Sequence, residues 1–231
     1  MKQERRAEPE PDADAGPPDR RSWLSLVVLL LVLGGAAFGA LWFAAAAAGP
    51  TPVDAAALRE SLDVRSPDLT AIAVALTEVG GTVVMAVVAL LAGGWLLARG
   101  RRADAVFVVG AMAGGAAVFR SLKVLIDRSR PPELSRLVAE TNESLPSGHA
   151  TMAVAVLGSL VVLAWPRRGT VGRWSMVLGV AGWAGAVGLT RIYLGVHWFS
   201  DVLAGWLVGG AWLALCTAVW SWYRSRTRLP T

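Results

Sequence analysis

The sequence is poor in charged residues, cysteine and histidine, and each shortage narrows what the chain can be. Only 17% of its 231 residues are charged, against about a quarter in a typical soluble domain, which argues against a soluble globular protein. The single cysteine, Cys216, lies in an apolar run and excludes an internal disulfide and a cysteine-based metal site. Only two histidines are present, so any histidine chemistry rests on His149 and His197.

Apolar residues are abundant instead. Hydrophobic residues make up 55% of the chain, with 11 Trp and 25 Gly. Both fit helices in a bilayer, because Gly lets helices approach closely and Trp sits at the membrane interfaces. A net charge of +5 can accompany nucleic-acid binding, but the arginines stand in short clusters between apolar runs. That distribution is typical of membrane topology, and we expect no nucleic-acid partner.

Six apolar runs reach the length of about 20 residues that spans a bilayer. They cover residues 23–48, 70–98, 104–122, 148–165, 174–190 and 201–222. The first run exceeds the core of a signal peptide, about 7–15 residues, so it is expected to be a retained helix, although the Ala-rich stretch 44–48 resembles a cleavage region. The sequence predicts an all-α integral membrane bundle of six helices with both termini on one side.

The polar segments define three regions. Residues 1–21 mix Pro, Asp, Glu and Arg and predict a disordered cytoplasmic tail. Residues 22–223 form the membrane domain, and 224–231 a short basic cytoplasmic tail. Residues 50–68 form the longest loop outside the catalytic region, with room for a short helix at the membrane interface. The second span is expected to start after a short interfacial or re-entrant piece near 69–76.

Basic residues predict the orientation in the membrane. Fourteen of the 22 Lys and Arg lie in the tails and in the loops on the same face: Lys2, Arg5, Arg6, Arg20, Arg21, Arg99, Arg101, Arg102, Arg167, Arg168, Arg173, Arg224, Arg226 and Arg228. The positive-inside rule makes that face cytoplasmic. The other basic residues gather mostly near 123–136 and at Arg191, on the opposite face. An anionic substrate explains why cations collect there.

Three short segments on that extracytoplasmic face carry the candidate chemistry. They read KVLIDRSRP from Lys123, PSGH from Pro146 and TRIYLGVHWFSD from Thr190. Both histidines of the chain lie in them. If the third helix continues to Arg130, then Lys123 and Arg130 stand two turns apart on one face, at about 10 Å.

Phosphate-ester cleavage needs fixed cations and N–H donors around the transferring group. Lys123, Arg130 and Arg191 can supply the charge, and the arginines offer forked donors. Ser147 and Gly148 precede a helix, whose N–H groups and dipole would point at phosphate. These five residues are the predicted phosphate-binding set.

The histidines and one carboxylate complete the predicted site. A neutral imidazole can attack phosphorus and form a phosphohistidine. We assign this role to His197, because Asp201 four residues later can hold its far ring nitrogen. His149 is the predicted general acid for the leaving oxygen and then the base for water. Two-metal phosphatases need clusters of carboxylates and histidines. Here the candidate residues are mainly basic, with Asp201 the one well-placed carboxylate, so no metal and no cofactor are required.

The three segments resemble the signature motifs of the type-2 phosphatidic acid phosphatase superfamily. This superfamily includes membrane lipid phosphate phosphatases and, more distantly, soluble vanadium haloperoxidases and bacterial acid phosphatases. The resemblance covers the order, spacing and helix placement of the motifs between Lys123 and Asp201, and it implies the same roles for the eight residues. One position departs from the family pattern, since Thr190 stands where the family usually has Ser.

Simpler explanations exist for single residues. Lysine and arginine can snorkel to headgroups, a histidine can be structural, and Asp201 can cap a helix. Together they leave unexplained why both histidines lie in motifs and why cations collect on that face. Two other functions use the same residues: a lipid transporter or flippase that only binds headgroups, and a phosphotransferase that passes the phosphoryl group to another acceptor.

The substrate is predicted only as a class. The membrane setting favours a lipid phosphate or pyrophosphate, and the Arg- and Ala-rich composition suggests a bacterial chain in the inner (plasma) membrane. A polyprenyl pyrophosphate of the undecaprenyl type is the first choice. Phosphatidylglycerol phosphate and phosphatidic acid are the alternatives. The sequence predicts no oligomeric state.

Overall fold

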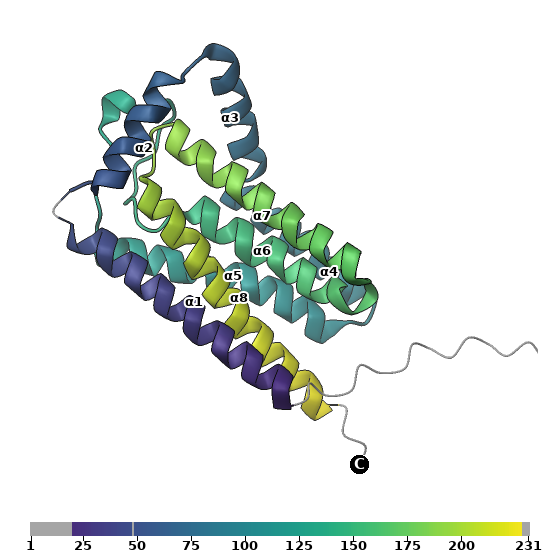
Figure 1. Ribbon diagram of the computed structural model, residues 1–231. Coiled ribbons are helices and arrows are strands. Elements are labelled where there is room, and N and C mark those ends of the chain that lie inside the picture. The colour runs from purple at the N-terminus through teal and green to yellow at the C-terminus, as the bar shows by residue number, and fades with distance from the viewer. Residues whose placement is uncertain (1–19, 48, 228–231) are drawn as a thin grey trace, which may run out of the picture.

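The computed structural model describes residues 20–47 and 49–227, and within them the chain is helical (Figure 1). The α-helices are α1 (Arg20–Ala46), α2 (Pro52–Asp63), α3 (Pro67–Val79), α4 (Thr82–Ala98), α5 (Arg102–Ile126), α6 (Gly148–Ala164), α7 (Thr170–Tyr193) and α8 (Phe199–Thr227). Two 3₁₀ turns, η1 (Glu133–Ser135) and η2 (Trp165–Arg167), complete the secondary structure of this part. The predicted all-α class is confirmed.

Six helical segments are long and apolar enough to cross a membrane. They are Trp23–Ala46, Pro67–Ala98, Arg102–Ile126, Gly148–Arg167, Thr170–Tyr193 and Phe199–Thr227. Their number and order confirm the predicted six spans, and the chain is a multi-pass membrane protein. Residues 1–19 and 228–231, which hold most of the two expected tails, lie outside the described residues. Helix α1 begins at Arg20, inside the expected tail 1–21, and helix α8 ends at Thr227, inside the expected tail 224–231.

The second span is broken into α3 and α4. Ser66 caps α3, its hydroxyl accepting from the Leu69 N–H at 3.2 Å, and Pro67 occupies the first helical turn. The helix ends at Gly80, and α4 begins after Gly81. The piece expected near 69–76 is therefore a longer helix of 13 residues.

The loop 50–68 contains the short helix α2. Thr51 and Asp54 form a capping box, in which each side chain accepts from the other residue's backbone N–H, at 3.2 and 3.0 Å. Figure 1 places α2 at one end of the bundle, and α2 packs against α7 and α8. This position brings α2 next to the first turn of α8.

Helix α6 is the central helix and packs against α4, α5, α7 and α8. Its contact with α8 is close because glycines face it: a Cβ on Gly205 would lie 2.7 Å from the Ser147 carbonyl oxygen, and one on Gly209 would lie 2.6 Å from that of Thr151. Small residues four apart allow such an approach between membrane helices. The approach holds the start of α6 beside the start of α8.

Helix α1 lies along α8 at the edge of the bundle (Figure 1). Only 6% of its most apolar 18-residue window is buried in the protein. Most of its large apolar side chains, such as Leu31 and Phe38, are exposed. Such a surface is stable only in an apolar solvent, which agrees with a helix at the lipid boundary.

Candidate active site

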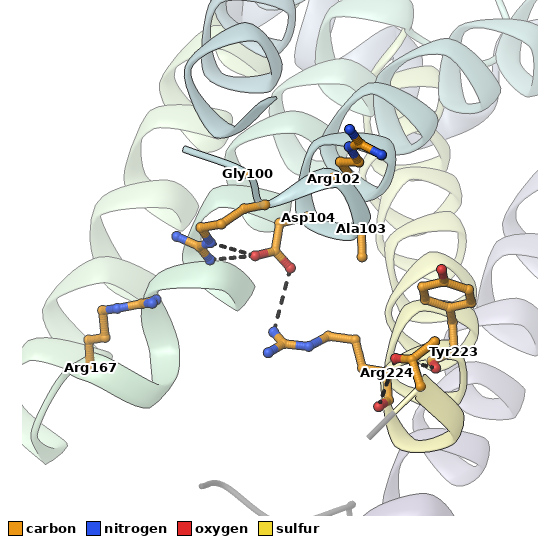
Figure 2. Close-up of a pocket in the computed structure, with 9 residues that line it drawn as sticks. Gly100, Arg102, Ala103, Asp104, Arg167, Tyr223 and Arg224 are labelled. Carbon is orange, nitrogen blue, oxygen red and sulfur yellow. Dashed lines mark hydrogen bonds and ion pairs between the residues drawn. The ribbon is translucent and has the colours of Figure 1, made fainter. Parts of the chain in front are cut away.

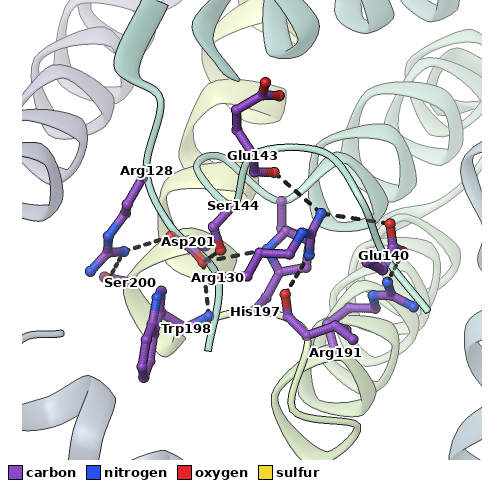
Figure 3. Close-up of polar contacts among 12 residues, drawn as sticks. Arg128, Arg130, Glu140, Glu143, Ser144, Arg191, His197, Trp198, Ser200 and Asp201 are labelled. Atoms are coloured by element: carbon purple, nitrogen blue, oxygen red, sulfur yellow. Dashed lines mark hydrogen bonds and ion pairs between the residues drawn. The ribbon is translucent and has the colours of Figure 1, made fainter. Parts of the chain in front are cut away.

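The structure brings the eight nominated residues together at one end of the bundle. They come from the end of α5, the start of α6, the end of α7, the start of α8 and the two connecting segments 127–147 and 194–198. Figure 3 shows polar contacts of four of them, Arg130, Arg191, His197 and Asp201, with their neighbours. Residues more than 70 positions apart in the chain meet here, so the site exists only in the folded bundle.

The first motif, Lys123 to Pro131, does not stay helical as far as Arg130. Helix α5 ends at Ile126, and Asp127 adopts the left-handed conformation, with φ 49°. Arg130 therefore does not lie two turns beyond Lys123 on one helix. The two cations meet through Asn142 instead, whose Oδ1 accepts from Lys123 Nζ at 3.3 Å and from Arg130 Nη2 at 2.6 Å.

His197 lies between a carboxylate and a guanidinium. Its Nδ1 is 3.4 Å from Asp201 Oδ2, and its Nε2 is 3.3 Å from Arg130 Nη1. A guanidinium can only donate, so Nε2 must accept and keep its lone pair. The proton then belongs on Nδ1, where Asp201 accepts it. This tautomer leaves Nε2 as a nucleophilic nitrogen.

The pKa of His197 agrees with this state. Burial lowers the pKa from 6.5 to about 3, and although the hydrogen bond with Asp201 raises it, the nearby Arg130 lowers it further. The imidazole is therefore neutral in the folded protein at neutral pH. A neutral imidazole is the form that can attack an electrophile.

Asp201 is fully buried and saturated with donors. Its Oδ2 accepts from the Trp198 N–H at 2.8 Å and from the Ser144 hydroxyl, besides facing His197. Its Oδ1 accepts from Arg128 Nη1 at 2.6 Å. Several donors on one carboxylate restrict its rotation, so the position of the His197 ring is restricted as well.

The start of α6 presents donors to the site. Thr151 N–H is the first to bond within the helix, to the Ser147 carbonyl at 3.0 Å, so the three N–H groups before it have no helical acceptor. Ser147 Oγ is buried and has no hydrogen-bond partner. In the described part of the chain only two other side-chain atoms share this state, Arg65 Nε and Arg191 Nε. Two of the three belong to the predicted phosphate-binding set.

His149, one residue into α6, is half-buried. It lies close enough to Arg191 and His197 to interact with them electrostatically. Across the site, its Nε2 faces the junction of α3 and α4, 3.7 Å from the position that a Cβ on Gly81 would take. The two histidines of the chain therefore share one site.

A carboxylate lies between two of the predicted phosphate-binding arginines. Glu140 forms an ion pair with Arg191 and a second one with Arg130, in which Oε2 is 3.6 Å from Nη2. Arg191 also donates to Thr77 Oγ1 at 2.9 Å. The two guanidinium groups can thus bind one anionic group jointly.

Sequence reasoning missed several residues of this network. Arg128 stands two positions before Arg130 inside the first motif, and Glu140, Asn142 and Ser144 lie in the connection to the second motif. The position of Arg128 inside that motif was the one available signal. Asp54, from α2, could not be connected with the site without the fold.

A different polar pocket lies at the opposite ends of α5 and α8 (Figure 2). There Asp104 pairs with Arg101 at 2.6 Å and with Arg224 at 3.5 Å. Neither histidine lines this pocket, which separates it from the site above. Among the described residues, no group of three His, Cys, Asp or Glu side chains is arranged to hold a metal ion.

Comparison with known proteins agrees with this geometry. Residues 104–226, just over half of the chain, match the PAP2 superfamily. An undecaprenyl-diphosphatase of Sulfolobus acidocaldarius is 39% identical over 74 residues, which are 32% of this chain and 32% of that protein. Phosphatidylglycerophosphatase B of Bacillus subtilis is 27% identical over 158 residues, which cover 68% of this chain and 77% of the relative. The chain thus spans only about a third of the first relative.

The fold is similar to a solved structure. The crystal structure of a transmembrane PAP2-type phosphatidylglycerolphosphate phosphatase from Bacillus subtilis superposes with a TM-score of 0.64 at 25% identity, covering 84% of this chain and 93% of that one. The family match includes all eight nominated residues and confirms the resemblance seen in the three motifs. The chain belongs to the PAP2 superfamily.

Proposed function

We propose that this protein is a lipid phosphatase that hydrolyses a polyprenyl pyrophosphate of the undecaprenyl type through a phosphohistidine on His197. The observation that carries the proposal is the placement of the His197 ring, whose Nε2 faces Arg130 while its Nδ1 faces Asp201. Lys123, Arg130, Arg191, Ser147 and Gly148 bind the phosphate in this proposal. The unpaired Ser147 Oγ and Arg191 Nε support it, since both are donors that an anionic ligand would satisfy.

The reaction proceeds in two displacements. His197 Nε2 attacks phosphorus while the bond to the leaving oxygen breaks, and His149, which enters this step as the imidazolium, gives that oxygen its proton. The now neutral His149 takes a proton from water, whose oxygen attacks the phosphohistidine. Inorganic phosphate leaves and His197 becomes neutral again. Asp201 stabilises the positive charge that His197 carries in the intermediate.

The site works without a metal ion in this mechanism. Cationic side chains surround the phosphate, and they supply the charge stabilisation that metal ions supply in two-metal phosphatases. A chelator is therefore expected to leave the rate of phosphate release unchanged. Loss of activity in chelator, restored by a divalent cation, would contradict this part.

The active site faces outward in the proposed topology. The bias of basic residues supports cytoplasmic termini in a bacterial inner membrane, with the site at the extracytoplasmic edge. A polyprenyl carrier released there by envelope synthesis would reach the site from the outer leaflet.

Phosphatidylglycerol phosphate is the second candidate substrate. The similarity to the Bacillus subtilis enzyme extends over more of this chain than the similarity to the undecaprenyl-diphosphatase. A panel of undecaprenyl pyrophosphate, phosphatidylglycerol phosphate and phosphatidic acid, assayed for phosphate release in detergent, ranks the three by kcat/KM. If another lipid of the panel has the highest kcat/KM, that lipid replaces undecaprenyl pyrophosphate as the proposed substrate.

The mechanism is tested with His197→Ala. This variant is expected to lose kcat by about 10⁴- to 10⁶-fold, the range for removing one member of a catalytic triad, while it keeps its elution volume. Full activity in the variant would refute the histidine nucleophile. The same samples separate the other functions. A flippase moves labelled lipid with its phosphate intact, and a phosphotransferase labels an added acceptor instead of releasing phosphate.

A further inference from the structure

Asp54 is a buried carboxylate that lies far from the three motifs in the sequence but touches two of them in the fold. It lies in the first turn of α2, and its side chain is fully buried. Its Oδ1 accepts from the Ser200 N–H at 2.8 Å, and its Oδ2 accepts from the Ser200 hydroxyl at 2.9 Å. Ser200 is the second residue of α8, so Asp54 caps the helix that carries Asp201.

Arg128 connects Asp54 with Asp201. Its Nη2 lies 2.8 Å from Asp54 Oδ2. Its Nη1 lies 2.6 Å from Asp201 Oδ1, a contact that Figure 3 shows. The Arg128 side chain is 8% exposed, and both carboxylates are fully buried. Burial raises the pKa of Asp54, but the Ser200 N–H and Arg128 outweigh it and hold that pKa below its usual value. The carboxylate is therefore ionised beside the cation.

The guanidinium of Arg128 gives one terminal nitrogen to each of two carboxylates. An arginine commonly meets a carboxylate as a fork, with two parallel N–H bonds to both oxygens. Because Asp54 occupies Nη2, only Nη1 reaches Asp201, and it takes Oδ1. Asp201 Oδ2 stays with the Trp198 N–H and with His197 Nδ1, whose 3.4 Å contact is the longer of the two.

We propose that Asp54 is a positioning residue for His197, which it controls by keeping Arg128 from closing a two-bond fork on Asp201. Without the Asp54 charge, the buried guanidinium has one anionic partner left and draws both Asp201 oxygens towards itself. The His197 ring then loses the acceptor that sets its tautomer and orientation. This inference rests on the proposed function, since it concerns the orientation of the proposed nucleophile.

Asp54 makes no contact with the two phosphate-binding cations that come from the first motif. Arg130 and Lys123 are held by Asn142 and by the Glu143 carbonyl, not by Asp54. Loss of Asp54 should therefore leave substrate binding intact and slow the chemical step. A purely structural role for Asp54 predicts a lower melting temperature with no selective loss of kcat.

The test compares Asp54→Asn with Asp104→Asn in the full-length protein in detergent. Both changes remove a buried carboxylate that pairs with arginines, but Asp104 lies at the opposite end of the bundle. We expect Asp54→Asn to lower kcat by about 10- to 100-fold, the usual range for residues that orient a functional histidine. KM should stay within about two-fold. Asp104→Asn should keep its kcat whatever its melting temperature.

A second variant, Arg128→Lys, tests the proposal if Asp54→Asn folds poorly. Arg128→Lys keeps the charge but offers one nitrogen, which cannot divide itself between Asp54 and Asp201 in the same way. It should also lose kcat at constant KM. Because both changes act through Asp201, the double variant should lose no more than about two-fold beyond the worse single variant.

Clear outcomes overturn the proposal. Wild-type kcat in a folded Asp54→Asn protein overturns it, as do losses that multiply in the double variant. Failure of both single variants to fold assigns the network to stability alone and has the same effect. Failure of the proposed function gives a different result: full activity of His197→Ala, or no phosphatase activity in the wild type.

Discussion

Arg130 Nη1 lies 3.3 Å from His197 Nε2, so a guanidinium that we assign to phosphate also determines the tautomer of the proposed nucleophile. The contact forces Nε2 to be an acceptor, and the proton stays on Nδ1. When a phosphate enters, the guanidinium can turn to it and free the lone pair. One arginine thereby prepares the nucleophile and then stabilises the group under attack.

Arg130→Lys should impair this double role. Lysine keeps the charge but lacks the planar fork that reaches Asn142 and His197 together. We expect kcat/KM to fall by about 10²- to 10³-fold, the range for losing one transition-state donor, measured as phosphate release. Arg136→Lys in the same loop, where the arginine donates to the Pro131 and Glu140 carbonyls, is the control and should stay near the wild type. Equal effects of the two changes would contradict the role of Arg130.

Glu140→Gln should strengthen anion binding. The Glu140 carboxylate pairs with Arg130 and Arg191, so a phosphate must replace it there. A neutral amide competes less, and the ion pair lost from this partly exposed site is worth about 1 kcal/mol. We expect the inhibition constant of inorganic phosphate to fall about five-fold, since 1 kcal/mol corresponds to that ratio. An unchanged or higher inhibition constant would show that Glu140 does not compete with phosphate.

Stability should depend on pH through His197. The folded protein keeps the pKa of His197 at about 3, whereas the usual value is 6.5. Between these values the unfolded chain binds a proton that the folded chain does not, so the free energy of unfolding decreases as the pH falls from 6.5 towards 3. The stabilisation from the neutral, buried ring is complete above pH 6.5.

His197→Asn removes this dependence. The melting temperature of the wild type should fall more than that of the variant between about pH 7.5 and pH 5, and the difference between the two isolates the histidine. Parallel curves for both proteins would contradict the lowered pKa.

Gly205→Ala should separate α6 from α8. The added Cβ would lie 2.7 Å from the Ser147 carbonyl oxygen, which is backbone and cannot turn away. Overpacking of this kind costs about 1–3 kcal/mol, and it should also reduce activity because Ser147 belongs to the site. Gly182→Ala in α7 is the matched control, since a Cβ added there would meet no neighbouring atom within 4 Å. Unchanged melting temperature and kcat in Gly205→Ala would show that the close approach is unnecessary.

Membrane orientation can be tested by cysteine labelling. In a Cys216→Ser background, a cysteine at Glu133 in the site loop should react in intact cells with a reagent that does not cross the membrane. A cysteine at Arg168, between α6 and α7, should react only after the cells are opened. Both positions are exposed, so access depends on the side of the membrane alone. Labelling of Arg168→Cys from outside would reverse the proposed topology.

The sequence by itself determined the class of the protein and nominated most of its candidate site. The length and apolarity of six runs are sufficient to predict spans, because each crosses the bilayer as a separate helix with its hydrogen bonds satisfied internally. The spacing of His197 and Asp201 is also local, since four residues place both side chains on one side of a turn. Motif order therefore nominated all eight residues of the candidate site without a structure.

The tertiary structure decided the contacts between segments. The end of α5 at Ile126 depends on Asp127 leaving the helix, and the meeting of Lys123 with Arg130 depends on Asn142, 19 residues after Lys123. The placement of Asp54 beside Ser200, 146 residues later, depends on how α2 packs against α8. Periodicity and spacing report only local neighbours, whereas such long-range pairs are set by helix packing, and that packing supplies the groups that orient the proposed nucleophile.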